Sequence, residues 1–199
     1  MRKIFLFASL LLAVIAVNAQ ATFGIKAGAN FSNVKASGDG ESETSDMKVG
    51  FNIGGLANIP VSDMFSVQPE LVFSMEGGKE EEDGIDFKLN FNYINIPVLL
   101  QYNSSGFIAE TGPQVGFLAG AKYKIDDDES DAKEDYENIN FSWAIGLGYK
   151  LPSGFGFNAR YNLGLSNIAK DNTDDYKEKA STIQVGVFYT FGGGGSARK

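Results

Sequence analysis

Apolar and polar residues alternate along residues 155–168 with a period of two. Phe155, Tyr161 and Leu163 share one parity, whereas the other parity carries Gly, Asn, Ser and Arg160. Successive side chains of a β-strand point to opposite faces, so the stretch predicts a strand with one apolar and one polar face. Which face points inward decides the class of protein.

The same alternation recurs along the chain and predicts eight strands, at 22–34, 47–59, 64–76, 87–101, 106–120, 139–150, 155–168 and 181–191. Their connections alternate in length. Those at 60–63, 102–106 and 151–154 are short and have turn chemistry, whereas those at 35–46, 77–86, 121–138 and 170–180 are long. In an up-and-down antiparallel sheet every second connection lies at the same end. We therefore expect four long loops at one end, and the short turns with both termini at the other.

The fourth run changes phase. Its apolar residues are odd-numbered up to Tyr93 and even-numbered from Ile94 onward. One extra residue would produce this change, so we predict a β-bulge near Tyr93–Ile94. Pro97 lacks an N–H donor and also suggests irregular pairing nearby. The alternative is two short strands with a break between them.

The composition of the polar faces indicates which side is inward. A soluble eight-stranded carrier such as a lipocalin points its apolar face inward and exposes long polar side chains. Here the polar faces are mostly Gly, Ser, Asn and Ala, which suit the interior of an eight-stranded barrel because that space is only just wide enough for side chains. We predict an all-β, eight-stranded, antiparallel up-and-down transmembrane β-barrel whose apolar face meets lipid. A soluble lipocalin-like carrier of apolar ligands is the alternative.

Aromatic residues support the membrane interpretation. The chain has 16 Phe, 8 Tyr and one Trp, and many of them, including Phe23, Phe65, Phe87 and Phe141, lie near predicted strand ends. Aromatic girdles at the two interfaces of a membrane barrel have this placement. Strands of about 9–13 residues also match a tilted membrane crossing.

The polar faces of the predicted strands contribute several charged residues to the interior, namely Lys26, Lys48, Glu70, Glu110, Lys150 and Arg160. Buried charges must be paired to be tolerated. We therefore expect a network of Lys26, Glu70, Glu110 and Arg160 in the lumen, with the structural role of filling it. A proton path or a small pore is the alternative role.

The missing residue types exclude several kinds of chemistry. The chain has no cysteine and no histidine, which rules out disulfides, thiol chemistry and Ser-His-Asp or Cys-His catalysis, and removes the commonest zinc ligand. If Glu76 is counted with its neighbouring loop, Glu70 and Glu110 are the only carboxylates on predicted strands. We expect no enzyme, cofactor or metal centre. The net charge of −8 argues against nucleic acid as a partner.

Residues 1–19 have the layout of a secretory signal peptide. Arg2 and Lys3 precede an apolar run at 4–17 and a small-residue site before Gln20, and the run is too short for a spanning helix. We expect export through a cleaved signal peptide, a barrel domain at 20–191, and a flexible Gly-rich tail at 192–199. A lone N-terminal anchor is the alternative for residues 1–19.

Acidic residues are concentrated in the predicted long loops. If Glu76 is counted with its neighbouring loop, these loops hold 22 of the 25 acidic residues. The segment 126–137 invites a calcium interpretation, but the sixth position of an EF-hand-type loop would be Asp131 instead of glycine, and no flanking helices are expected. We expect at most weak divalent-cation binding by this loop. The EF-hand ligand positions 1, 3, 5 and 12 would be Asp126, Asp128, Ser130 and Glu137.

Five stretches in order resemble the PorT-like outer-membrane β-barrel family of Gram-negative bacteria. They are "GIKAGANFSNV" (24–34), "NYINIPVLLQY" (92–102), "AETGPQVGFLAG" (109–120), "FSWAIGLGYKL" (141–151) and "ARYNLGLSNI" (159–168). The resemblance covers essentially the whole chain after residue 20. It departs at Asn95, where family members often have Glu, which removes one possible carboxylate from the lumen.

The last predicted strand, "QVGVFYTF" (184–191), resembles the sorting signal read by the outer-membrane assembly machinery. Gln184, Gly186, Tyr189 and Phe191 fill its pattern. The resemblance implies an outer-membrane location, with membrane lipids and the assembly machinery as partners. The leading functional hypothesis is a non-enzymatic protein with a structural or surface-interaction role. An accessory part in protein secretion, as the namesake family member implies, is the alternative.

Overall fold

The computed structural model describes residues 21–38, 40–82, 85–125, 128–170 and 176–191. The predicted signal peptide and the Gly-rich tail lie outside these residues, so both stay predictions. Within the described ranges, no helix is long and apolar enough to cross a membrane.

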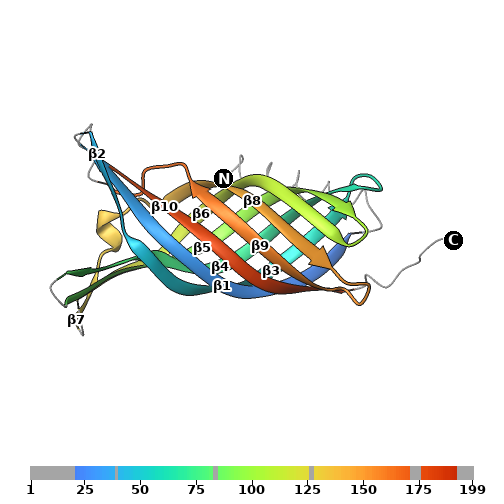
Figure 1. The fold of residues 1–199 in the computed structure, drawn as a ribbon, viewed down its shortest axis with the longest axis horizontal. Coiled ribbons are helices and arrows are strands. Elements are labelled where there is room, and N and C mark those ends of the chain that lie inside the picture. Colours follow the sequence, from blue (N-terminus) through green and yellow to red (C-terminus); the bar gives the residue numbers. More distant parts are fainter. Residues whose placement is uncertain (1–20, 39, 83–84, 126–127, 171–175, 192–199) are drawn as a thin grey trace, which may run out of the picture.

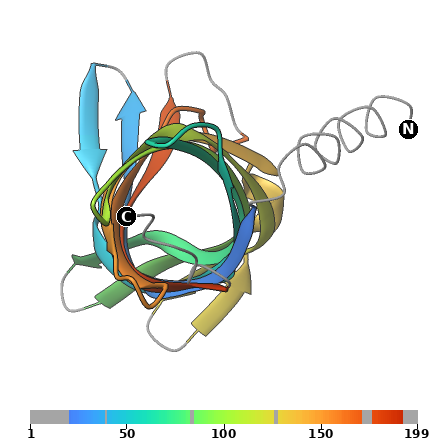
Figure 2. The same cartoon turned by 90° about the vertical axis from the view of Figure 1, so that its right-hand side faces the viewer.

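Eight long antiparallel strands form the wall of the molecule (Figure 1). They are β1 (Thr22–Gly38), β3 (Asp46–Pro60), β4 (Phe65–Glu82), β5 (Ile85–Ser104), β6 (Phe107–Ile125), β8 (Ile139–Lys150), β9 (Phe155–Gly164) and β10 (Lys177–Phe191). β1 pairs with β3 on one side and with β10 on the other, so the sheet closes on itself, as the view along the barrel shows (Figure 2). The predicted all-β antiparallel barrel is confirmed.

Two four-residue strands extend the wall at one end. β2 (Glu41–Thr44) pairs with the end of β1, β7 (Asp128–Asp131) pairs with the end of β6, and the 3-10 turn η1 (Lys133–Asp135) follows β7. We call this the loop end (Figure 1). The short turns after β3, β5 and β8 lie at the opposite, turn end, where β1 begins and β10 finishes. Gly106 and Gly154 in two of these turns have a φ of 89°, which glycine adopts without strain.

Several strand boundaries differ from the prediction, since β1, β6 and β10 extend four or five residues further toward the loop end. The segment 77–86 is largely a hairpin instead of an irregular loop, because β4 and β5 stay paired to Glu82 and Ile85. β9 ends at Gly164, four residues early. The amides of Leu165 and Ser166 both donate to the Phe141 carbonyl, at 2.9 and 3.3 Å, and the chain then turns so that Ile168 is fully buried.

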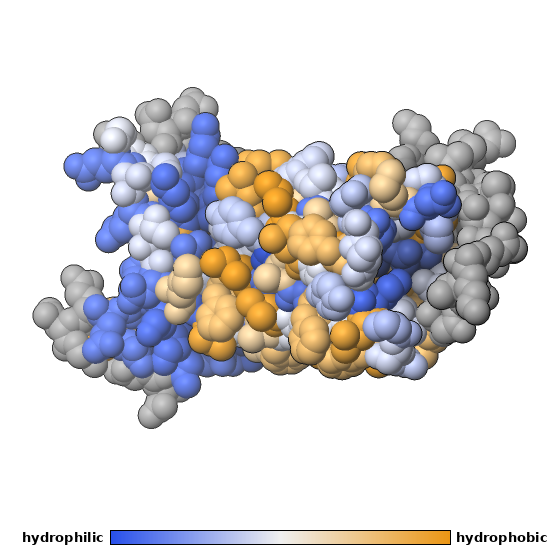
Figure 3. All heavy atoms as spheres, turned by 45° about the vertical axis from the view of Figure 1, so that its right-hand side comes forward, coloured by the Kyte–Doolittle hydropathy of each residue, from blue (hydrophilic) through white to orange (hydrophobic). Residues whose placement is uncertain are grey.

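The apolar parity of the strands faces outward along the middle of the barrel. Ile25, Ile53, Leu71 and Ile145 are each more than half exposed, whereas Asn30 on the other face has no exposed surface. Apolar residues accordingly cover the middle of the barrel, and hydrophilic residues gather at the loop end (Figure 3). The lipocalin-like alternative is wrong, because a soluble carrier would have these two faces exchanged.

A register irregularity lies near Tyr93, where the bulge was predicted, but the strand that carries the extra residue is not β5. The register between β5 and β6 does shift by one residue at Asn92/Tyr93, but the extra residue is Ala119 on β6. β5 keeps one parity throughout: Phe91, Tyr93 and Gln101 are all buried on its inner face. The apparent phase shift in the sequence therefore has another cause: most apolar residues of β5 lie on the inner face before residue 93 and on the outer face after it.

Along β5 the polarity of the two faces is exchanged near residue 93. Toward the turn end the outer face is apolar, as at Ile96, and the inner face is polar, as at Gln101. Toward the loop end the outer face carries Lys88, and the inner face carries Phe91. Such an exchange is expected where a barrel leaves lipid, because the outside becomes aqueous and the inside can hold a small apolar core. Phe87, predicted in an aromatic girdle, therefore faces inward instead.

The apolar belt can be tested on one face of β1. Ala27 is exposed within the belt, and Asn33 lies on the same face nearer the loop end. We expect Ala27→Lys to lower the free energy of unfolding by about 2–4 kcal/mol, because the charge enters hydrocarbon, and Asn33→Lys to lower it by about 0–1 kcal/mol. Urea unfolding in lipid vesicles, followed by heat-modifiable gel migration, measures both. Equal losses would contradict the assignment of the belt.

Candidate functional site

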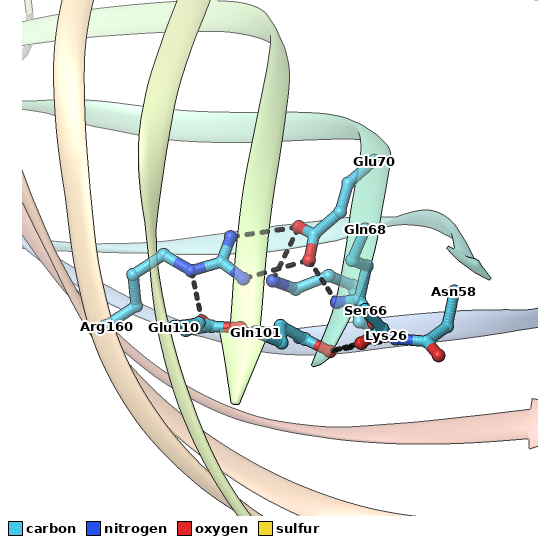
Figure 4. Close-up of polar contacts among 8 residues, drawn as sticks. All are labelled: Lys26, Asn58, Ser66, Gln68, Glu70, Gln101, Glu110 and Arg160. Carbon is cyan, nitrogen blue, oxygen red and sulfur yellow. Dashed lines mark hydrogen bonds and ion pairs between the residues drawn. The ribbon is translucent and has the colours of Figure 1, made fainter. Parts of the chain in front are cut away.

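The lumen is crossed by an ion-pair network that we call the charge layer, made of Lys26, Glu70, Glu110 and Arg160 (Figure 4). The guanidinium of Arg160 donates two hydrogen bonds of 2.9 Å to the two carboxylate oxygens of Glu70. Its Nε donates to Glu110 Oε1 at 2.8 Å, and Lys26 Nζ donates to Glu70 Oε2 at 3.0 Å. The structure therefore brings all four residues of the expected network together.

The charge layer braces the barrel across its width. Its four members come from β1, β4, β6 and β9, which are every second strand around the ring. β4 and β9 are opposite one another in this order, so the bidentate pair of Glu70 with Arg160 spans the lumen. Two cations and two carboxylates balance each other, and all four side chains are almost completely buried.

Gly146 on β8 makes room for this contact. It pairs in register with Glu110 on one side and with Arg160 on the other. A Cβ atom added to Gly146 would lie 2.8 Å from Glu110 Oε1. Arg160 can reach Glu110 across the intervening strand because that strand has no side chain at this point.

Neutral side chains occupy the remaining hydrogen-bonding positions of the two carboxylates. Gln68 Nε2 donates to Glu70 Oε1 at 2.8 Å, and Gln101 Nε2 donates to Glu110 Oε2 at 2.9 Å. Asn58 and Ser66 continue this network toward the turn end through hydrogen bonds to Gln101 Oε1. The cavity among the charge-layer residues is about 20 Å³, which is room for about one water molecule.

A third buried carboxylate was missed by the sequence analysis, which placed Glu76 in an acidic loop. Glu76 is 5% exposed on the inner face of β4. Its carboxylate accepts hydrogen bonds from Ser74, Asn95 and Thr182 at 2.7, 2.9 and 3.2 Å. Glu76 has the same parity as Glu70 in the predicted strand, and this signal in the sequence could have placed it on the inner face.

Asn95, at the position where the PorT-like family often has Glu, contributes to the lumen as a hydrogen-bond donor. Asn95 supplies a donor to Glu76 instead of a further carboxylate. Asn52 donates to Asn30, which donates to Ser74, at 2.6 and 2.8 Å. These amides and hydroxyls distribute neutral donors around Glu76, which makes no ion pair within 4 Å among the described residues.

An apolar cluster, which we call the plug, closes the lumen above Glu76. Phe91 packs against Tyr136 with ring centroids 4.7 Å apart in an edge-on arrangement. The plug draws on four strands, β1, β5, β6 and β10, and on the segments around η1 and after β9. It was not foreseen. Its buried members are Val34, Phe91, Tyr93, Leu118, Ala121, Ala132, Ile168 and Ala180.

The other predicted site residues lie apart from the charge layer. Lys48 and Lys150 are half-buried nearer the two ends, and Lys48 Nζ donates to the Glu76 carbonyl at 3.3 Å. The residues of the expected assembly signal all lie on β10, with Gln184 buried and with Tyr189 and Phe191 exposed. Their role in assembly stays a prediction.

The described part of the acidic segment 126–137 does not fold into a compact ligand-binding loop. Asp128 and Ser130 belong to β7, which pairs with β6, and Glu129 forms an ion pair with Lys122. Asp126 lies outside the described residues. Across the described ranges, no group of three or more acidic side chains is placed to hold a metal ion, and weak cation binding by this segment stays a prediction.

Comparisons with known proteins agree with this architecture. The family described as the outer membrane protein beta-barrel domain matches residues 18–170. The chain therefore belongs to this family and is an outer-membrane β-barrel protein. Its narrower assignment as PorT-like stays a prediction.

Two solved structures with low sequence identity are similar to this chain, and the first of them supports the shared fold. The crystal structure of Neisserial surface protein A (NspA) matches with a TM-score of 0.57 and 16% identity, over 86% of this chain and 99% of that chain. The structure of Ail, the attachment invasion locus protein of Yersinia pestis, in complex with the heparin analogue sucrose octasulfate, matches with a TM-score of 0.47 and 15% identity, over 86% and 99% of the two chains. No curated protein matches the sequence.

The charge layer and Glu76 are expected to respond differently to the loss of a charge. Glu70→Gln leaves Arg160 and Lys26 buried without one balancing charge, so we expect the free energy of unfolding to fall by about 3–5 kcal/mol. Glu76→Gln keeps its three hydrogen-bonding neighbours and removes an unpaired buried charge, so we expect a change below about 1 kcal/mol. Urea unfolding in vesicles compares the two. A larger loss for Glu76→Gln would contradict the assignment of the charge layer.

Proposed function

We propose that this protein is a non-enzymatic, non-conducting outer-membrane barrel that presents its loop end for interactions at the cell surface. The observation that carries the proposal is the filled lumen. The charge layer leaves a cavity of only about 20 Å³, and the plug adds a second, apolar closure above it. Transport through the barrel would require both to be displaced, which leaves the two ends as the places for function.

The loop end is favoured over the turn end by its construction. Five strands, β1, β4, β5, β6 and β10, continue beyond the apolar belt, and β2 and β7 add further pairing there. Among the residues that the structure describes, nearly all acidic ones outside the lumen belong to segments at this end. The turn end has three tight connections and Asp63 as its only acidic residue among those connections.

A catalytic role has little support from the charge layer. Both oxygens of Glu70 are taken by Arg160 and further donors, and Glu110 is held by Arg160 and Gln101. A general acid or base needs access to a substrate proton, whereas these carboxylates are buried and face one another. We therefore assign the charge layer a structural role.

The filled lumen predicts the absence of ion conductance. In planar lipid bilayers we expect the purified protein to produce no stable conductance steps, because about one water molecule fits among the charge-layer side chains. Phe91→Ala should still not conduct, since the charge layer stays in place. Stable open-channel steps from the unaltered protein would contradict the proposal.

Shortening the hairpin that joins β4 and β5 tests which end carries the function. Residues 80–87 are replaced by Asn-Gly, a two-residue turn that suits a hairpin, and heat-modifiable migration verifies that the barrel still folds. We expect cells with this variant to share the phenotype of a deletion of the gene. If the variant behaves as wild type while the deletion loses surface proteins, the secretion role implied by the PorT-like resemblance is favoured instead.

A further inference from the structure

A pocket of about 180 Å³ opens at the loop end, directly above the plug. It is built by the inner faces of strands that continue past the apolar belt. Its lining includes the plug residue Val34 and Leu89, which packs against the plug. Its volume is below the range of about 300–1,000 Å³ that suits drug-sized ligands. It can therefore hold a small molecule or a single side chain.

One wall of the pocket is acidic because of strand register. Ala36 on β1 pairs with Glu43 on β2 at one side and with Glu178 on β10 at the other. Paired residues of neighbouring strands point to the same face, and strands lie about 5 Å apart, so two carboxylates flank a small residue at a separation of about 10 Å. The arrangement parallels Gly146 between Glu110 and Arg160, except that both flanking charges here have the same sign.

The opposite wall is aromatic. Phe87 on β5 and Tyr123 on β6 lie with ring centroids 6.4 Å apart, and Phe87 pairs in register with Glu80. Tyr136 and Tyr176 add two further rings to the lining. The hydrogen bond from Tyr176 to Glu178, 2.7 Å long, raises the pKa of Tyr176 to about 12. Burial raises the pKa of Tyr136, so both phenols stay neutral at pH 7.

The charges of this pocket are unbalanced. Glu43, Glu80 and Glu178 line it, and within the described part of the chain none of them forms an ion pair. Lys79 is the single cationic residue in the described lining, and it stands opposite Asp46 in the register of β3 and β4. A cavity with three carboxylates and four aromatic rings offers both ion pairing and ring faces to a cation.

We propose that this pocket binds a small organic cation, namely an ammonium or guanidinium group carried on a short apolar body. The cationic group lies between Glu43 and Glu178 above Ala36, and the apolar body lies against Phe87 and Tyr123. The inference rests on the proposed function, because it gives the interactions of the loop end a chemical class. The same chemistry is carried by a free amine and by a lysine or arginine side chain of a peptide.

Fluorine NMR of the full chain, labelled with 3-fluorotyrosine, tests the proposal in a non-ionic sugar detergent. A detergent with a choline headgroup is avoided, since that group is itself an organic cation. The probes are n-butylammonium, the neutral n-butanol, and N-acetyl-lysine methylamide, which represents a side chain in a peptide. We expect saturable shifts with n-butylammonium and none with n-butanol over the same concentrations. Binding of the lysine derivative at least as tight as that of n-butylammonium indicates a peptide as the source.

Matched variants connect the binding to the acidic wall. The double variant Glu43→Gln/Glu178→Gln should weaken n-butylammonium binding by about three- to tenfold, as expected for two partly exposed ion pairs. Glu129→Gln, on β7 and paired with Lys122 outside the pocket, should leave the affinity unchanged. Equal binding of n-butanol and n-butylammonium, or an unchanged affinity in the double variant, would overturn the inference. Bilayer conductance of the unaltered protein tests the filled lumen without involving the pocket, so a failure of the proposed function is distinguishable from a failure of this inference. The shortened hairpin removes Glu80 and Phe87 of the pocket and therefore does not separate the two.

Discussion

The rest of the structure depends on the pairing of Arg160 with Glu70 and Glu110. An eight-stranded barrel has an interior only as wide as its own side chains, so that interior must be filled. A charge placed there is costly unless its partners surround it. Arg160 meets this requirement by reaching across the barrel to β4 with two bonds and past Gly146 to β6 with a third. Lys26 supplies the second cation, and the layer is neutral.

A second constraint acts along the axis of the barrel. Within the apolar belt the wall has lipid outside and polar side chains inside, whereas beyond the belt it has water outside and the plug inside. β5 crosses this boundary without changing its parity. The strand can do so because its polar and apolar residues exchange faces at the boundary, so that beyond the belt Lys88 is outside and Phe91 is inside. The plug thus lets the strands stay paired far beyond the belt, where the pocket is formed.

The family of outer-membrane β-barrels explains the location of this protein better than its activity. A fold shared with NspA at 16% identity is a scaffold, and function is decided by the groups that the scaffold holds. Here those groups fall into two classes. The charge layer is closed and balanced, which suits a structural role, and the pocket at the loop end is open and carries unbalanced negative charge.

The sequence by itself determined the eight strands, the lipid-facing parity and the four members of the charge layer. These follow from a period of two, which is local, and from the rule that charges on the inner face need partners. Only the tertiary structure showed that the extra residue of the bulge is Ala119 and that Glu76 and Ile168 are buried. It also gave the strand register that places Ala36 between Glu43 and Glu178. Strand register and strand order bring together residues that are far apart in the chain. The medium that a strand face meets, lipid or water, changes along the barrel axis. Alternation along a single strand contains neither kind of information.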